Sequence, residues 1–341
     1  MSHFRSIVFA IVIGIVMVSC NSSPSGPNNS SGNNALFVLN ANAQNVSRVN
    51  LDSATVTNDF ATAGDVPADI AVYGSDLLIL NSTPPSLEVT DLADGTVKKT
   101  VNLPLQSNPY QILVDQDAIY ITGWLSNQLY LVNGLDYSLV DSVEVGVNPQ
   151  GLIANQDYIF VANSGGYPNY SASTVSVVNK SDFTLQKNIQ VDLNPQNFAW
   201  GPLGNLHVVC TGDYSSVGGR VDIIDPGALN VQGVLQFGGT PGFISITDQG
   251  FGYLTDYGTS NYGFLYKYDA LQNTVIRDQS NPIQINPGAM DLLFDQAASR
   301  LYVANFGVAT VQEFSTKDET LVNTYTVSDG PQSLALYREQ P

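Results

Sequence analysis

Residues 148–179 read NPQGLIANQDYIFVANSGGYPNYSASTVSVVN, and they contain the pattern that decides the fold. Three short runs, GLIA, IFVAN and VSVVN, are rich in apolar residues, and Asn, Gly, Pro or Ser separates one run from the next. Apolar residues at alternate positions are typical of strands that bury one face, and turn residues between such runs favour antiparallel neighbours. The stretch therefore predicts three consecutive strands, the first opened by Pro149.

The same pattern recurs along nearly the whole chain. A proline opens it at seven places, at intervals of 42, 40, 46, 46, 46 and 44 residues: Pro67, Pro109, Pro149, Pro195, Pro241, Pro287 and Pro331. A fourth run, such as SLVDSVEVG from Ser138, ends each unit before the next proline. Repeats of about 40–45 residues with four short antiparallel strands predict the blades of a β-propeller, which is an all-β fold.

The register of the first strand in each unit predicts which residues line the centre of the ring. Apolar residues lie three and five places after each proline, so we expect the residue between them to face a central channel. These residues are Ala71, Leu113, Ile153, Ala199, Ser245, Asp291 and Ala335.

The two ends of the repeat predict how the ring closes. Residues 35–61 contain a second, third and fourth strand without a first strand, whereas residues 332–338 form a first strand without successors. Pairing these segments completes a seventh blade and leaves no blade with an unpaired end. The sequence thus predicts a single seven-bladed domain over residues 35–341.

Residues 1–19 predict a lipoprotein signal peptide. Arg5 precedes an uncharged apolar run, residues 7–18, which is shorter than the about 20 residues that a membrane-spanning helix needs. Met17, Val18, Ser19 and Cys20 resemble a bacterial lipobox, which implies cleavage before Cys20 and acylation of that cysteine. The lipobox pattern, with Asn21 rather than Asp next, also implies the outer membrane of a bacterial envelope. A secretory signal that ends near a cysteine by chance is the alternative.

Residues 20–34 predict a lipidated cysteine followed by a flexible tether. The segment after Cys20 reads NSSPSGPNNSSGNN and contains no apolar residue, so it has nothing to bury. The other cysteine, Cys210, lies in a predicted strand, and we interpret it as a packing residue.

The charge of the chain favours some partners over others. Loss of Arg5 with the signal leaves 11 basic against 30 acidic residues, a net charge of −19. Such a field repels a polyanion, so we expect no nucleic-acid partner. An acidic surface that merely keeps an exported protein soluble is the simpler reading, and a surface suited to a cationic partner is the other. We expect a monomer.

The strands LYVAN from Leu301, IFVAN from Ile159 and VSVVN from Val175, with Asn-Pro or Gly-Pro at the repeat boundary, resemble the YVTN-repeat family of seven-bladed propellers. The resemblance covers residues 35–338. It implies the fold and leaves the function open, because the family includes surface-layer proteins, periplasmic proteins, and relatives of lactonases and dehydrogenase subunits.

Few residues suit catalysis or metal binding. His3 leaves with the signal, and His207 occupies a position that aromatic residues fill in other repeats, so we interpret it as structural. Asp69, Asn197 and Asp291 are candidate metal ligands near the channel, with Asp291 expected deeper in the wall than Asp69. Calcium usually takes six to eight oxygen ligands. We therefore expect no cofactor, with calcium as the alternative.

Aromatic loops give the clearest indication of a binding surface. The connections between the second and third strands are long in three adjacent blades, beginning at Ser164, Thr211 and Tyr257. They should lie on the same face as the boundary prolines, which we call the top face. The predicted ligand-binding residues of this face are Trp124, Gln150, Tyr167, Tyr170, Gln196, Tyr214, Tyr257, Tyr262 and Gln332. Tyrosine among Gly, Ser and Asn is suited to recognition, although these rings would also serve simply to cover the blade ends.

The sequence therefore predicts a non-catalytic binding or scaffold module, anchored at the bacterial envelope, that recognises a glycan or protein through the top face. A metal-assisted, lactonase-like or hydrolytic enzyme that uses Asp69 and Asp291 is the alternative function.

Overall fold

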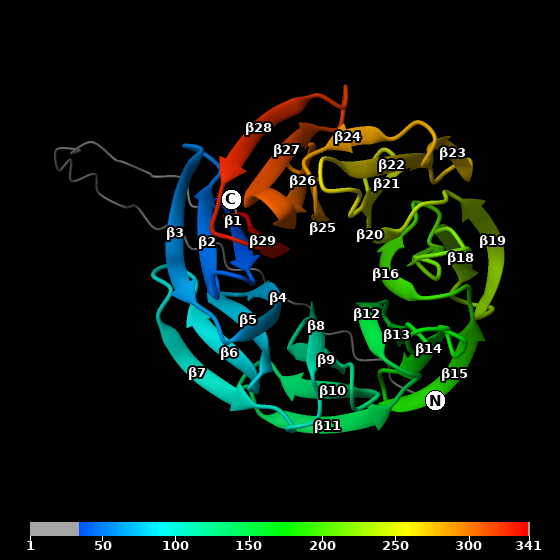
Figure 1. The fold of residues 1–341 in the computed structure, drawn as a ribbon. Helices are drawn as coiled ribbons and strands as arrows, with labels where there is room; N and C mark the ends of the chain where they lie inside the picture. The colour runs from blue at the N-terminus through cyan, green and yellow to red at the C-terminus, as the bar shows by residue number, and fades with distance from the viewer. Residues whose placement is uncertain (1–33, 340–341) are drawn as a thin grey trace, which may run out of the picture. The chain divides into compact units, whose positions relative to one another are not determined.

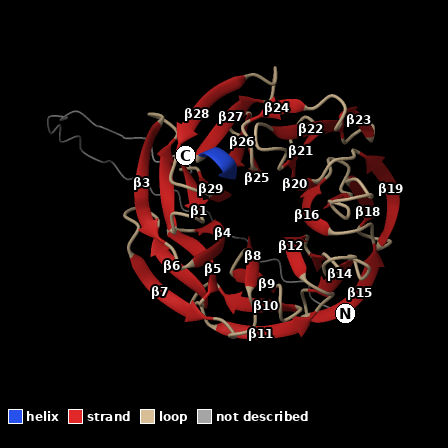
Figure 2. Ribbon diagram, in the orientation of Figure 1, coloured by secondary structure: helices blue, strands red, loops and turns tan. Residues whose placement is uncertain are grey.

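A computed structural model describes residues 34–339, which form seven antiparallel sheets arranged around a central channel (Figure 1). Strands and short loops make up this part of the chain, together with one 3-10 turn, Phe306–Val308 (Figure 2). The predicted signal peptide, Cys20 and all of the predicted tether except Asn34 lie outside the described residues. Within residues 34–339, no helix is long and apolar enough to cross a membrane.

Each blade runs from an innermost to an outermost strand. The first three complete blades in chain order are β4 (Val66–Tyr73), β5 (Asp76–Thr83), β6 (Pro85–Asp91) and β7 (Val97–Asn102); β8 (Pro109–Asp115), β9 (Ala118–Gly123), β10 (Gln128–Asn133) and β11 (Leu139–Glu144); and β12 (Pro149–Ala154), β13 (Tyr158–Asn163), β14 (Thr174–Asn179) and β15 (Thr184–Gln190).

Three more blades follow the same order. They are β16 (Pro195–Trp200), β17 (Leu206–Cys210), β18 (Arg220–Asp225) and β19 (Asn230–Gln236); β20 (Pro241–Ile246), β21 (Phe251–Asp256), β22 (Gly263–Asp269), β23 (Thr274–Arg277) and β24 (Ile283–Ile285); and β25 (Ala289–Asp295), β26 (Arg300–Asn305), β27 (Thr310–Ser315) and β28 (Leu321–Thr326). In the second of these, both β23 and β24 pair with β22, because a short loop interrupts the outermost strand.

The seventh blade joins the two ends of the chain, as predicted. Strand β29 (Pro331–Tyr337) is innermost and pairs antiparallel with β1 (Ala35–Asn40), which is followed by β2 (Asn45–Asn50) and β3 (Thr55–Thr62). The register places Ala35 opposite Tyr337 and Leu36 opposite Leu336. The ring is therefore closed by hydrogen bonds between segments about 300 residues apart in the sequence.

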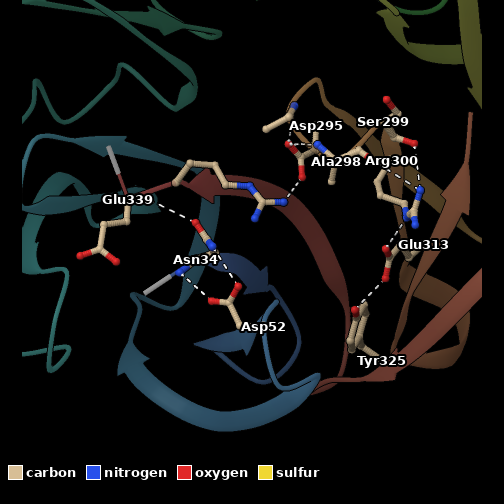
Figure 3. A network of polar contacts seen from close by, with 11 residues as sticks. Asn34, Asp52, Asp295, Ala298, Ser299, Arg300, Glu313, Tyr325 and Glu339 are labelled. Carbon is tan, nitrogen blue, oxygen red and sulfur yellow. Dashed lines mark hydrogen bonds and ion pairs between the residues drawn. The ribbon is translucent and has the colours of Figure 1, made fainter. Parts of the chain in front are cut away.

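Polar contacts secure this closure at the end of β29 (Figure 3). Arg338 forms an ion pair with Asp295 of the preceding blade, whose carboxylate is almost fully buried and also accepts from the backbone N–H groups of Ala297 and Ala298. The side chain of Asn34 donates to Asp52 at 2.9 Å and accepts from the backbone N–H of Glu339 at 3.3 Å. Side chains thus hold both chain segments that form the closure: Arg338 follows β29, and Asn34 precedes β1.

The hydrophobic core lies between the blades. Alternate residues of one strand pack against opposite neighbours: Leu77 and Ile79 contact the closure blade, whereas Leu78 and Leu80 contact the blade of β8–β11. Because each blade faces a neighbour on both sides, both faces of its inner strands are covered.

This arrangement corrects the predicted channel lining. Five of the seven side chains four places after the prolines pack against the apolar clusters between blades: Ala71, Leu113, Ile153, Ala199 and Ala335. The top end of the channel is lined instead by residues one or two places after the boundary position in every blade except that of β12.

The structure also corrects the register of one repeat. Five of the boundary prolines lie opposite the last residue of the second strand, as Pro149 lies opposite Asn163, and Pro67 lies opposite Asn81, two residues before the end of β5. In the β25 blade Ala289 takes this place, opposite Asn305. The preceding residue has a positive φ in both blades, 53° at Asn148 and 78° at Gly288, a conformation that Asn and Gly tolerate. Pro287 is therefore not the equivalent of the other prolines, and Asp291 lies at the level of Asp69, not deeper.

Removal of residues 331–341 should abolish cooperative unfolding of the domain, because it deletes β29 and exposes the inner edge of β1. Thermal unfolding followed by circular dichroism tests this expectation. Removal of residues 340–341 alone is the matched control and should leave the melting temperature within about 2 °C, a shift that corresponds to roughly 1 kcal/mol in a domain of this size. A cooperative, wild-type-like transition in the longer truncation would show that closure is not required.

Candidate functional site

A cavity of about 400 Å³, which we call the channel-mouth cavity or main cavity, lies at the top end of the channel. It is built from the starts of the innermost strands and from loop residues beside them. The polar lining comprises Asp69, Ser82, Asn108, Gln111, Gln196, Asn197, Asp291, Gln332 and Ser333, and the other lining residues are Val66, Pro67, Ala68, Tyr110, Trp124, Phe243 and Met290. Strand β12 contributes no residue to this lining. The cavity is therefore off-centre within the ring, and it contains no Lys, Arg or His among its described lining residues.

Short backbone hydrogen bonds place the loops between second and third strands over this cavity. The N–H of Trp124, just after β9, donates to the carbonyl of Asn108, just before β8, at 3.0 Å. The N–H groups of Ser164 and Thr211 make the same contact with Asn148 and Asn194 in their own blades. The predicted placement of these loops on the same face as the boundary prolines is confirmed by these contacts.

In three blades, the side chain two places after the boundary position caps the inner edge of the next blade. Asp69 Oδ2 accepts from the N–H of Ile112 in the next blade at 2.8 Å, and Asp291 Oδ2 accepts from the N–H of Leu334 in the next blade at the same distance. Gln111 Oε1 makes the equivalent contact with the next blade at 2.9 Å, to the N–H of Leu152. These contacts satisfy backbone donors that no further strand can reach.

The two aspartates also accept additional hydrogen bonds. Ser333 Oγ donates to Asp69 Oδ1 at 2.6 Å, and the N–H of Leu292 donates to Asp291 Oδ1 at 2.7 Å. Ser333 belongs to the blade between those of Asp291 and Asp69. The two carboxyl groups thus flank a serine on three consecutive inner strands.

Burial makes both carboxyl groups difficult to ionise. Loss of hydration raises the pKa of Asp69 to about 6, even though three hydrogen bonds oppose the shift. The pKa of Asp291 rises to about 7 through burial and through the nearby negative charge of Asp69. Each group keeps part of its surface on the cavity, while the channel walls replace most of its water. Near neutral pH the pair can therefore gain or lose a proton.

Aromatic side chains continue from the cavity to the outside. Tyr110 lines the cavity, and burial raises its pKa to about 12, with smaller contributions from Tyr214 and Asp69. Tyr214 makes an edge contact with Tyr170 at 6.1 Å between ring centroids, and Tyr170 makes another with Tyr167 at 6.2 Å. Tyr167, Tyr170 and Tyr214, which we call the tyrosine cluster, thus connect two long loops of adjacent blades.

The predicted binding residues fall into three groups. Trp124, Gln196 and Gln332 line the cavity, together with the three candidate metal ligands. Tyr167 and Tyr214 are exposed members of the tyrosine cluster, whereas Tyr170 is buried beneath them. The remaining residues lie elsewhere: Tyr257 and Tyr262 are exposed without a ring contact to the cluster among the described residues, and Gln150 is buried outside the cavity lining.

Several cavity residues were missed by the sequence reasoning. Tyr110 follows its boundary proline by one place, Gln111 and Phe243 follow theirs by two, and Met290 follows Ala289 by one. In the β16 blade, the residues one and two places after Pro195 were predicted as site residues: Gln196 and Asn197. Applying that rule to every blade would have found Tyr110, Gln111 and Phe243, but Met290 required the corrected register.

The candidate metal ligands provide few oxygens for a cation. Among residues 34–339, no group of three or more His, Cys, Asp or Glu side chains is placed to hold a metal ion. Asn197 Oδ1 already accepts from the N–H of Phe198 at 2.7 Å. Two carboxylates and one amide fall short of the six to eight oxygens that calcium takes.

The remaining histidine and cysteine lie inside blades. His207 is fully buried, and its Nδ1 lies 2.8 Å from the hydroxyl of Tyr268, while burial lowers its pKa to about 4. Cys210 is also buried, and burial raises the pKa of its thiol. Neither side chain lines the channel-mouth cavity.

Three solved structures share this fold. A putative 6-phosphogluconolactonase from Bacteroides fragilis NCTC 9343 is 14% identical and has a TM-score of 0.69, with 92% of this chain and 100% of that chain covered. Hydrazine synthase from Kuenenia stuttgartiensis is 17% identical, with a TM-score of 0.67 and coverages of 79% and 89%. The dihydro-heme d1 dehydrogenase NirN, in complex with DHE, is 11% identical, with a TM-score of 0.65 and coverages of 92% and 77%.

At these identities the likeness establishes the seven-bladed β-propeller fold. No family model matches the chain, and no curated protein matches it.

Titration of the two aspartates should make stability depend on pH. Both pKa values lie above the ordinary 3.8, so ionisation costs more in the folded protein, and the free energy of unfolding should fall as pH rises from about 4 to about 7. At 1.36 kcal/mol per pKa unit, the upper limit is roughly 3 kcal/mol for Asp69 and roughly 4 kcal/mol for Asp291. Urea unfolding at several pH values measures the free energy of unfolding of the wild type and of Asp291→Asn.

The variant should show a flatter pH dependence, and subtraction of the two curves cancels contributions from groups such as His207. Asp248→Asn, at an exposed turn, is the matched control and should retain the wild-type curve. If the free energy of unfolding changes with pH equally in the wild type and in Asp291→Asn, Asp291 does not titrate with a raised pKa.

Proposed function

We propose that this chain is a non-catalytic binding or scaffold module that recognises a glycan or protein through the channel-mouth cavity and the tyrosine cluster. The observation that carries the proposal is the lining of the cavity. Amide, hydroxyl and carboxyl groups alternate there with the rings of Tyr110, Trp124 and Phe243. A concave site with apolar surfaces and a few fixed polar groups is the usual form of a small-molecule or polymer subsite.

The charge of the lining favours a neutral or cationic ligand. The cavity has two carboxyl groups and no basic side chain among its described residues, so a phosphate or carboxylate in the ligand would lack a partner of opposite charge. Sugar hydroxyl groups suit the amides of Gln196 and Gln332, and the flat face of a sugar ring suits the indole of Trp124. This chemistry supports a neutral or amino-bearing glycan over a phosphorylated metabolite.

The tyrosine cluster supports a ligand longer than the cavity. Tyr167 is 82% exposed and Tyr214 is 59% exposed, and both rest on the buried ring of Tyr170. A rigid ring loses little conformational entropy when it binds, so it provides contact area at small cost. A polymer held in the cavity by one unit would contact these rings with the next units.

The location is also part of the proposal. The lipobox-like sequence at Met17–Cys20 supports a lipid anchor at Cys20, which would hold a monomeric propeller at the bacterial envelope, at the outer membrane. Covalent acyl chains contribute about 0.8 kcal/mol for each buried methylene group.

A metal-assisted, lactonase-like or hydrolytic activity is the second candidate. The raised pKa values of Asp69 and Asp291 favour it, because carboxyl groups that titrate near neutrality are suited to proton transfer. Lactone hydrolysis measured with and without added calcium, for the wild type and for Asp69→Asn, distinguishes the two candidates. Calcium-dependent turnover lost in Asp69→Asn would favour the enzyme.

Binding to an array of envelope glycans, followed by calorimetry on the best glycan, tests the main proposal. Trp124→Ala should weaken binding about three- to tenfold, because an aromatic contact contributes about 0.5–1.5 kcal/mol. The double variant Tyr167→Ala, Tyr214→Ala should weaken binding of long glycans more than of short ones.

Tyr262→Ala is the matched control for these substitutions, because Tyr262 is half exposed and lies outside both the cavity lining and the tyrosine cluster. Its affinity should equal that of the wild type. Equal affinities in all variants would exclude both surfaces as the binding site.

A further inference from the structure

A second cavity, of about 250 Å³, lies between the closure blade and the blade of β4–β7. Phe37 of β1, Arg48 of β2 and Tyr337 of β29 line one side. Ser75, in the turn from β4 to β5, and residues 91–93, which are the last residue of β6 and the two after it, line the other side. Because innermost strands begin at the top face, the end of β29 and the turn after β4 place this cavity toward the opposite face of the ring. We call it the Arg48 cavity.

Among residues 34–339, Arg48 has no carboxylate partner, which is unusual in so acidic a protein. The other four arginines among residues 34–339 all form ion pairs: Arg220, Arg277, Arg300 and Arg338. The Nη1 atom of Arg48 reaches only the carbonyl of Ala93, at 3.5 Å, and its Nε is buried without an acceptor. The guanidinium carbon lies 5.6 Å from the ring centroid of Phe60, so the side chain rests on an aromatic ring.

The carboxylate within the Arg48 cavity is already engaged. Asp91 lines the cavity, but Lys98 lies 2.8 Å from its Oδ2, and the N–H of Ala93 donates to its Oδ1 at 2.8 Å. These contacts lower the pKa of Asp91, and Lys98 is shared with Asp76, whose Oδ1 lies 2.6 Å from its Nζ. Arg48 therefore keeps a cationic fork of donors that forms no ion pair with an acidic side chain of residues 34–339.

The rest of the lining suits a small organic acid. Ser75 and Tyr337, which both carry a hydroxyl group, line the same space, and Phe37 and Leu92 provide apolar walls. The volume corresponds to about eight water molecules at about 30 Å³ each, which is the size of one monosaccharide or amino acid. A guanidinium binds a carboxylate with two parallel hydrogen bonds, and burial strengthens such a contact.

We propose that the Arg48 cavity binds a small monocarboxylate, such as a sugar acid, with its carboxylate on Arg48 and its carbon skeleton against Phe37 and Leu92. This site is separate from the channel-mouth cavity and takes a ligand of the opposite charge. Repulsion from the acidic surface acts over long range and is screened beyond about 8 Å at physiological salt, whereas the contact with Arg48 is local.

Titration with D-glucuronate tests the site, with D-glucose as the uncharged counterpart of the same size. The reporter is the ¹H–¹⁵N resonance of the Arg48 Nε–H group, and calorimetry gives the affinity. The wild type should bind glucuronate and shift this resonance, and glucose should do neither. Glucose and glucuronate acting alike, or no shift with glucuronate at tens of millimolar, would overturn the proposal.

Substitutions locate the binding. Arg48→Gln should weaken glucuronate binding at least about tenfold, and Arg48→Lys should retain part of it, because lysine keeps the charge but loses the planar fork. Ser75→Trp leaves Arg48 in place but should block the cavity from an exposed turn, so it tests the site even if substitution of Arg48 disturbs folding. Arg277→Gln, a partly exposed arginine outside the cavity, is the control and should bind as the wild type does. Unchanged affinity in both Arg48→Gln and Ser75→Trp would contradict the proposed location.

Discussion

The pairing of β29 with β1 is the interaction on which the rest of this structure depends. A blade of four strands buries little alone, and its faces are covered only when it has a neighbour on each side. Six blades in an open arc would leave two apolar faces without a partner, such as the face of the β4–β7 blade that carries Leu77 and Ile79. One strand supplied from the far end of the chain completes the seventh blade and gives every face a neighbour.

Closure solves the problem of blade faces but leaves the innermost strand of each blade with a free edge. In three blades, the side chain two places after the boundary position satisfies a backbone N–H group at the edge of the next blade: Asp69, Gln111 and Asp291. These side chains must stand at the channel mouth to reach their donors, so they also form the polar lining of the main cavity. A structural requirement thus places acceptor groups where a ligand would meet them. The choice of carboxylates at two of these positions exceeds that requirement, since Gln111 performs the same capping without charge.

The sequence predicted the fold well because the signal is repeated. The number of blades, the order of strands and the closure all follow from seven copies of one pattern. A misread residue in one copy does not change the predicted fold, because the other six copies agree. The site was predicted less completely because it depends on single residues. Pro287 resembled a boundary residue, yet the residue with positive φ before the strand is Gly288, and a two-residue shift moved Asp291 to the level of Asp69. The burial of Tyr170 and Gln150 could not be foreseen, since it depends on how neighbouring loops pack and not on the repeat.

The position of β1 within the closure blade has a mechanical consequence. This strand lies between β29 and β2, and both neighbours run antiparallel to it over its full length of six residues. A force applied along the chain at Asn34 would therefore load two ladders of hydrogen bonds in shear, so that they must break together and not one after another. The ring therefore resists a pulling force at Asn34, where the described part of the chain begins.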